Sequence, residues 1–174
     1  MNQVFVHDQL IRFSHCDPAA IVYFPRFFDL AHSTMEDWFA QGVGFALPEL
    51  IIKRRVGTPT VSLDCEFIKP LRMGDTLRFE LRVTKLGNAS MGLQYRGLKD
   101  EVEHLRISQT VVFMDLDAAR AVPIPDDVRA GIETFVVART TIRLTNHPLG
   151  DVKRIILSNT NRPTTLQFRT GSPR

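Results

Sequence analysis

Residues 25–41 repeat large apolar side chains at three- and four-residue steps, and this repeat limits the possible folds of the chain more than any other feature. Polar residues fill the remaining positions, which is the pattern of an amphipathic helix. Pro25 suits the first helical turn, because the amide it lacks would be unpaired there, and Gly42 favours an end to the helix. Such a helix needs a second layer to cover its apolar face. We assign to the core the apolar residues Phe27, Phe28, Ala31, Met35, Trp38 and Phe39.

Four segments after this helix alternate apolar and polar residues with the two-residue period of a β-strand. Short turns rich in Pro, Gly and Asn separate them, which is typical of antiparallel hairpins. Another strand is predicted before the helix. We therefore predict an α+β fold in which one curved five-stranded antiparallel sheet wraps around one long helix. A single helix leaves part of the sheet uncovered, so self-association is expected. The predicted strands span residues 3–14, 60–69, 76–86, 90–98 and 104–116.

The strand predicted over residues 60–69 has two different faces. Asp64 and Glu66 are expected to face solvent or another subunit. The apolar face carries Val61, Leu63, Cys65 and Phe67.

The chain changes character near residue 138. Before it, a short helix is predicted over residues 126–133. Beyond it the periodicity fades, and seven Lys or Arg residues stand against the single Asp151. We predict one domain over residues 1–137 and a basic C-terminal extension over 138–174 that is solvated and poorly ordered. Binding of nucleic acid is not expected, because the extension lacks the interleaved aromatic residues on which bases stack.

Composition excludes several other classes of protein. No run of eighteen apolar residues occurs and the N-terminus lacks a basic stretch followed by an apolar one, so a soluble, cytoplasmic protein without a membrane span is expected. Cys16 and Cys65 are too few for a disulfide framework and are expected to be reduced. The cysteines and the five histidines show no close metal-ligand spacing, so no metal site is predicted.

Asp17 is the candidate for chemistry. The first predicted strand runs into Ser14-His15-Cys16-Asp17-Pro18, and Pro18 keeps the preceding residue out of the helical region. The Asp17 carboxylate is thus presented from a loop just before the long helix. From the Asp-Pro pair alone, a turn or capping residue would be the simpler interpretation.

The longer segment 15–28 favours a catalytic interpretation. It reads HCDPAAIVYFPRFF, and it resembles the signature of the 4-hydroxybenzoyl-CoA thioesterase family, which is roughly Asp-Pro-Ala-Gly-Ile-Val-aromatic-Tyr/His-Pro at the start of a long helix. The order of the predicted elements over residues 3–133 is similar to that of the family as well. The resemblance implies a hot-dog fold, a homodimer or homotetramer with active sites between subunits, and hydrolysis of an acyl-CoA without a metal or organic cofactor.

In this family interpretation, Asp17 either attacks the thioester carbonyl or acts as a base toward water, and the backbone amide of Phe24 faces the carbonyl oxygen. Tyr23 is a candidate for packing against the substrate, and Thr60 for approaching the site from a partner subunit. The sequence does not decide whether the acyl group of the substrate is aromatic or short-chain. An acyl-carrier-protein thioesterase or a non-catalytic protein that binds acyl thioesters is the alternative.

The segment departs from the family signature at two positions. Ala20 replaces the usual glycine, which narrows the conformations open to the loop. Phe24 replaces Tyr or His, so an amide donor survives there but a side-chain donor does not. His15 and Cys16 flank Asp17, yet neighbours in an extended strand point to opposite sides, so we do not predict a Cys-His nucleophile.

Overall fold

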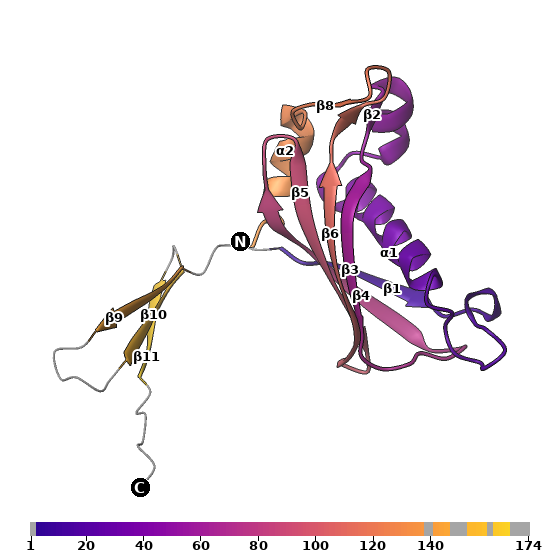
Figure 1. The fold of residues 1–174 in the computed structure, drawn as a ribbon, viewed down its shortest axis with the longest axis horizontal. Helices are drawn as coiled ribbons and strands as arrows, with labels where there is room; N and C mark the ends of the chain where they lie inside the picture. The colour runs from indigo at the N-terminus through magenta and orange to yellow at the C-terminus, as the bar shows by residue number, and fades with distance from the viewer. Residues whose placement is uncertain (1–2, 138–140, 147–152, 160–161, 168–174) are drawn as a thin grey trace, which may run out of the picture. The chain divides into compact units, whose positions relative to one another are not determined.

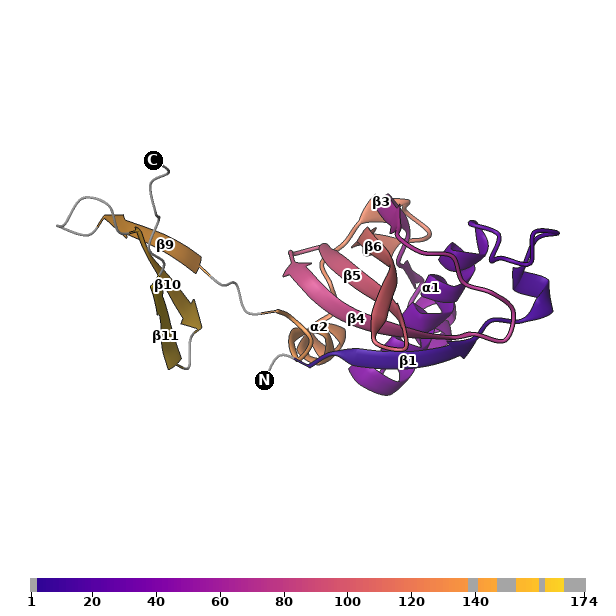
Figure 2. The same cartoon turned by 90° about the horizontal axis from the view of Figure 1, so that it is seen from below.

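The computed structural model describes residues 3–137, 141–146, 153–159 and 162–167. The chain divides into two compact units, Met1–Val137 and Ala138–Arg174. In the first unit a five-stranded antiparallel sheet curls around one helix, as Figures 1 and 2 show, and this confirms the predicted α+β fold. The strand order is β1-β4-β5-β6-β3. The elements are α1 (Arg26–Asp37), β1 (Phe5–Leu10), β3 (Thr60–Phe67), β4 (Thr76–Leu86), β5 (Ser90–Lys99) and β6 (Val102–Val112).

The helix continues past α1 with a wider turn. Residues Trp38–Val43 form a π-helical segment, and Gly44 ends it with a φ of 82°. The Trp38 ring is completely buried and packs edge-on against Phe39 and Phe135, with centroid distances of 5.1 and 5.6 Å. A second π-helical segment, Glu49–Lys53, was not predicted. The aromatic part of the helix is therefore the centre of the core, as its apolar repeat indicates.

Strand β3 lies at one edge of the sheet, next to β6 alone. Its apolar residues are not covered: Val61 is 60% exposed, Leu63 42% and Phe67 49%. The alternation of residues 60–69 correctly indicated a strand, but the side that it marks as apolar lies open within the described chain. An edge position explains the difference, because the core and α1 cover β3 only in part, at Cys65 and Phe67.

The remaining elements are small. Short strands β2 (Val56–Gly57), β7 (Met114–Asp115) and β8 (Arg120–Ala121) pair with one another, and α2 (Asp126–Glu133) has the predicted bounds. No helix within the described ranges is long and apolar enough to cross a membrane.

The second unit contains an antiparallel sheet with the order β11-β10-β9. Regular structure was not expected beyond Ala138, so these three strands differ from the prediction. Residues 138–140, 147–152, 160–161 and 168–174 lie outside the described part, and the poor order proposed for the extension stays a prediction. The strands are β9 (Thr141–Asn146), β10 (Lys153–Asn159) and β11 (Arg162–Gln167).

Truncation of the central aromatic residue tests this description of the core. Trp38→Ala is expected to lower the free energy of unfolding by about 3–5 kcal/mol, because it leaves a cavity between two aromatic rings. Phe13→Ala serves as the control, since Phe13 is 83% exposed, and it is expected to change stability by less than about 0.5 kcal/mol. Denaturant unfolding measures both. Equal effects of the two substitutions would contradict the proposed core.

Candidate functional site

A closed loop between β1 and α1 presents the Asp17 carboxylate. The backbone amide of Asp17 donates to the carbonyl oxygen of Ile21 (3.0 Å), and that of Ala20 donates to the carbonyl oxygen of Asp17 (2.9 Å). The Ala19 amide donates to Asp17 Oδ1 at 2.8 Å. This last bond fixes one carboxylate oxygen in the turn, and no hydrogen bond joins Oδ2 to any described residue. The carboxylate is half-buried and is oriented by its own loop.

Ala20 occupies the left-handed region of backbone space, with a φ of 59°. This is the position at which the family signature has glycine, and it explains that preference, because glycine adopts a positive φ without a steric penalty. The loop is therefore built as the signature requires, with an alanine that must bear some strain.

The start of α1 leaves one amide free beside this loop. The amides of Arg26, Phe27 and Phe28 donate to the carbonyl oxygens of Tyr23, Phe24 and Pro25 at 2.8, 3.2 and 3.0 Å. The Phe24 amide, in contrast, has no acceptor among the described residues. A free amide at the positive end of a helix is a donor suited to an oxygen that gains negative charge.

A cavity of about 300 Å³ lies beside Phe24. Phe24 lines it, whereas Asp17 and Tyr23 do not. Phe67, from the end of β3, contacts Phe24, Phe27 and Phe28 with ring centroids at 6.3, 5.7 and 6.5 Å. The lining consists of Ile21, Val22, Phe24, Phe27, Phe67, Ile68, Lys69, Pro70 and Leu71.

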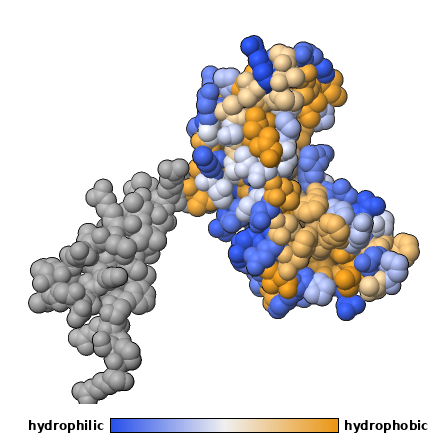
Figure 3. Space-filling view, viewed as in Figure 1, coloured by the Kyte–Doolittle hydropathy of each residue, from blue (hydrophilic) through white to orange (hydrophobic). Residues whose placement is uncertain are grey.

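Hydrophobic residues also reach the surface at this end of the first unit, where Figure 1 places the loop after β1 and Figure 3 shows orange areas. Phe67 was not predicted as a site residue. The alternation of residues 60–69 marked Phe67 as an apolar position of the strand. Nothing in that segment indicates that the end of β3 lies beside the start of α1.

The turn between β3 and β4 is fastened to the Asp17 loop. The Val22 amide donates to the Leu71 carbonyl oxygen (2.9 Å), and Ile21 forms an antiparallel bridge with Arg72. Asp75 closes the turn, because its carboxylate accepts hydrogen bonds from the Arg72 amide and the Lys99 ammonium at 2.8 and 2.7 Å. Burial by itself would raise the pKa of Asp75, but these two bonds outweigh it and lower that pKa below its usual value. The turn is thus held by an ionised carboxylate.

The other predicted residues lie around this centre. Tyr23 is exposed, and its ring packs edge-on against Phe24 at 5.4 Å. Thr60 is outside the cavity at the start of β3, where its hydroxyl accepts a hydrogen bond from Gln109 Nε2 at 2.6 Å. The roles assigned to Tyr23 and Thr60 stay predictions.

His15 and Cys16 do not pair with each other. His15 Nδ1 accepts a hydrogen bond from the Arg12 amide (3.0 Å), and Cys16 Sγ donates to the Arg12 carbonyl oxygen (3.7 Å). Burial, with smaller effects of the Arg12 and Arg26 charges, lowers the pKa of His15 and favours its neutral form. Within the described ranges, no three His, Cys, Asp or Glu side chains converge as a metal site would need. The roles assigned to the Asp17 carboxylate and to the Phe24 amide stay predictions at this point.

Comparison with known proteins shows which family and which solved structures this chain is similar to. Residues 11–132 match the model of a protein family described as "Thioesterase-like superfamily". A 1,4-dihydroxy-2-naphthoyl-CoA hydrolase from Thermosynechococcus vestitus is 27% identical over 129 residues, which cover 74% of this chain and 88% of the hydrolase.

Solved structures share the fold. A thioesterase superfamily protein from Jannaschia sp. CCS1 is 29% identical with a TM-score of 0.73, covering 79% of this chain and 96% of that protein. A 1,4-dihydroxy-2-naphthoyl-CoA thioesterase from Synechocystis has a TM-score of 0.69 at 22% identity, covering 75% and 96%.

Because Ala20 has a positive φ and is strained, glycine substitutions at Ala20 and at the neighbouring Ala19 are expected to change the free energy of unfolding in opposite directions. Ala20→Gly is expected to stabilise the protein by about 1 kcal/mol, because glycine removes the penalty of a positive φ. Ala19→Gly is expected to destabilise it by about 0.5–1 kcal/mol through the greater freedom of the unfolded chain. Thermal and denaturant unfolding would measure both changes. A loss of stability in Ala20→Gly would contradict the loop conformation described here.

Proposed function

The chain belongs to the Thioesterase-like superfamily of hot-dog proteins, and we propose that it is an acyl-CoA thioesterase that hydrolyses its substrate to the free acid and CoA. The observation that carries this proposal is the pairing of the Asp17 loop with the unpaired Phe24 amide at the start of α1. The family match and the relatives named as CoA hydrolases support the reaction class.

In the proposed reaction the thioester carbonyl oxygen binds at the Phe24 amide. Attack on the carbonyl carbon moves negative charge onto that oxygen, where the amide and the positive end of α1 stabilise it. Asp17 either attacks directly, giving an anhydride that water then cleaves, or removes a proton from the attacking water. In both routes the C–S bond breaks and CoA leaves as a thiolate, which takes up a proton. An ionised Asp17 serves both routes.

We propose an aromatic acyl group as the preferred substrate. The cavity beside the Phe24 amide is walled by Phe24, Phe27 and Phe67, and aromatic rings favour offset or edge-on packing against one another. Relatives are named as hydrolases of 1,4-dihydroxy-2-naphthoyl-CoA, an ester whose acyl group has two fused aromatic rings. A 4-hydroxybenzoyl ester is a smaller substrate of the same class, and short-chain esters are the competing class.

We further propose that the protein acts as a homodimer at least, with β3 in the interface. The exposed apolar residues Val61, Leu63 and Phe67 lie along this edge strand, whose outer backbone groups have no partner strand among the described residues. A second copy would cover both. This arrangement would also bring Thr60 of a neighbouring subunit toward a shared site.

Replacement of the proposed catalytic carboxylate tests the function. Asp17→Asn is expected to lower kcat by about 10²–10⁴-fold, because the amide neither attacks nor accepts a proton effectively. Thiol release would be measured with 1,4-dihydroxy-2-naphthoyl-CoA, 4-hydroxybenzoyl-CoA, a short aliphatic acyl-CoA and an acyl-carrier-protein ester.

The matched control is Asp126→Asn, an exposed carboxylate at the start of α2, which is expected to keep full activity. Circular dichroism and light scattering would show that both variants keep the fold and the oligomer. Full activity of Asp17→Asn would exclude the assigned role. Faster release from the carrier-protein ester than from every CoA ester would instead favour the alternative of a carrier-protein thioesterase.

A charge in the middle of β3 tests the proposed dimer. Leu63→Glu is expected to shift the protein to the monomer in light scattering, because a buried, unpaired carboxylate is costly in an interface. Val102→Glu is the matched control, since Val102 at the start of β6 is also 42% exposed. If both variants keep the oligomer of the wild type, β3 is not the interface.

A further inference from the structure

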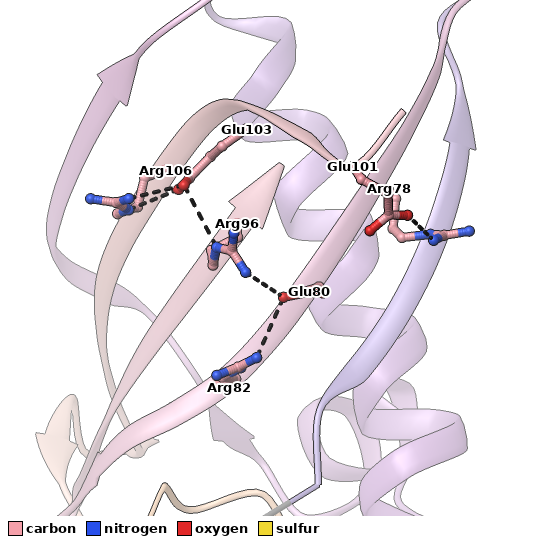
Figure 4. A network of polar contacts seen from close by, with 7 residues as sticks. All are labelled: Arg78, Glu80, Arg82, Arg96, Glu101, Glu103 and Arg106. Atoms are coloured by element: carbon pink, nitrogen blue, oxygen red, sulfur yellow. Dashed lines mark hydrogen bonds and ion pairs between the residues drawn. The ribbon is translucent and has the colours of Figure 1, made fainter. Parts of the chain in front are cut away.

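Most basic side chains on the sheet are already paired with carboxylates. Figure 4 shows a chain of ion pairs in which Glu80 contacts Arg82 and Arg96 (3.4 and 3.1 Å), and Glu103 contacts Arg96 and Arg106 (3.7 and 2.9 Å). These arginines have neighbouring negative charges that compete with any incoming anion. They are therefore poor candidates for binding a phosphate group.

Lys69 and Arg72 differ from these arginines because they have no carboxylate partner and lie on the turn between β3 and β4. Both side chains are exposed, and neither is within 4.0 Å of a carboxylate oxygen of the described residues. Lys69 lines the cavity at the Phe24 amide and is the single ionisable residue of that lining. Arg72 lies beside it on the same turn, bridged to Ile21 of the Asp17 loop. One cation without a carboxylate partner, Lys69, thus lines an otherwise apolar cavity, and a second, Arg72, directly follows the lining residue Leu71 on the same turn.

The backbone that carries these two residues is held on both sides. The amides of Ile68 and Lys69 both donate to the His104 carbonyl oxygen, at 2.8 and 3.0 Å, and His104 Nδ1 lies 3.2 Å from the Pro70 carbonyl oxygen. The Arg72 amide donates to Asp75, whose other oxygen already contacts Lys99. Both Asp75 oxygens are therefore occupied by other donors, and Asp75 forms no ion pair with the Arg72 guanidinium. The turn is preorganised, which lowers the entropic cost of binding a ligand at its side chains.

We propose that Lys69 and Arg72 bind the phosphate groups of CoA at the mouth of the cavity and so position the thioester at the Phe24 amide. This inference rests on the proposed thioesterase function. Guanidinium and ammonium groups form charge-assisted hydrogen bonds with phosphate oxygens, and such bonds are stronger than neutral ones. The pantetheine arm then follows the apolar lining from the phosphates toward α1.

Substrates with and without phosphate groups test this assignment. Lys69→Gln and Arg72→Gln keep much of each aliphatic stem and remove the charge. With the acyl-CoA that the wild type hydrolyses fastest, each variant is expected to raise KM roughly tenfold, the effect of one lost charged hydrogen bond, while kcat is unchanged. With the same acyl group on pantetheine, which lacks every phosphate, KM is expected to stay that of the wild type. The acyl-dephospho-CoA distinguishes the 3′-phosphate from the pyrophosphate.

Lys85→Gln is the matched control, because Lys85 is exposed near the other end of β4, and it is expected to leave KM unchanged for every ester. An unchanged KM for the CoA ester in the Lys69 and Arg72 variants overturns the inference, as does an equal rise for the pantetheine ester. A rise confined to an acyl-carrier-protein ester also overturns it and indicates a carrier-protein surface.

Failure of the catalytic proposal can be separated from failure of this inference. If the wild type hydrolyses none of the esters, calorimetric titration with CoA itself still tests the two cations. Weaker binding of CoA to Lys69→Gln and Arg72→Gln than to the wild type and Lys85→Gln supports the phosphate site. Equal binding to all four proteins, or no binding to the wild type, overturns it.

Discussion

The packing of α1 into the concave face of the sheet is the interaction on which the rest of this structure depends. The helix buries Phe27, Leu30 and Met35 against the strands, and a polar contact fixes its position along β1. Gln9 Nε2 donates to the Thr34 hydroxyl and to the Leu30 carbonyl oxygen, both at 2.7 Å. Because Thr34 is fully buried, breaking this contact would leave polar atoms without partners in the core. Apolar burial thus holds the helix in place, and the Gln9 bonds set its register.

The position of α1 decides where its first turn lies, and the candidate site is assembled around that turn. The β1–α1 loop brings Asp17, and the β3–β4 turn brings Lys69 and Arg72 through its contacts with Val22 and Ile21. Ala20 shows that the loop keeps its form despite a less favourable residue. Two segments distant in sequence, the β1–α1 loop with the start of α1 and the β3–β4 turn, therefore meet here, and backbone hydrogen bonds join them. Such bonds depend little on side-chain identity, so the surrounding side chains can vary without loss of the frame.

The site has a charge distribution suited to a long amphipathic ligand. The cavity lining is aromatic and aliphatic apart from Lys69, its residue Phe24 has an unpaired backbone amide, and Arg72 directly follows the lining residue Leu71. An acyl-CoA has the matching order of groups, with an acyl portion, a flexible arm and phosphates. The open side of β3 adds an apolar surface next to the same cavity through Phe67. A partner subunit on that edge would complete the wall of the cavity, which links oligomerisation to catalysis in the proposed function.

Local sequence predicted most elements of the first unit, because each repeat reports which side of an element is buried. Strand β4 and helix α2 have the predicted bounds and β5 ends one residue later, but β6 spans Val102–Val112 instead of 104–116. The second π-helical segment and the strands beyond Ala138 were not predicted. The loop before α1 also follows from local features, since Pro18 and Pro25 restrict the backbone around it, whereas the Phe24 amide was indicated only by the resemblance to the family signature. Only the tertiary structure decided that β3 is an edge strand with an open apolar face, and that Phe67, Lys69 and Arg72 stand beside Phe24. Those facts depend on strand order and on contacts between distant segments, which the pattern of residues within one segment does not encode.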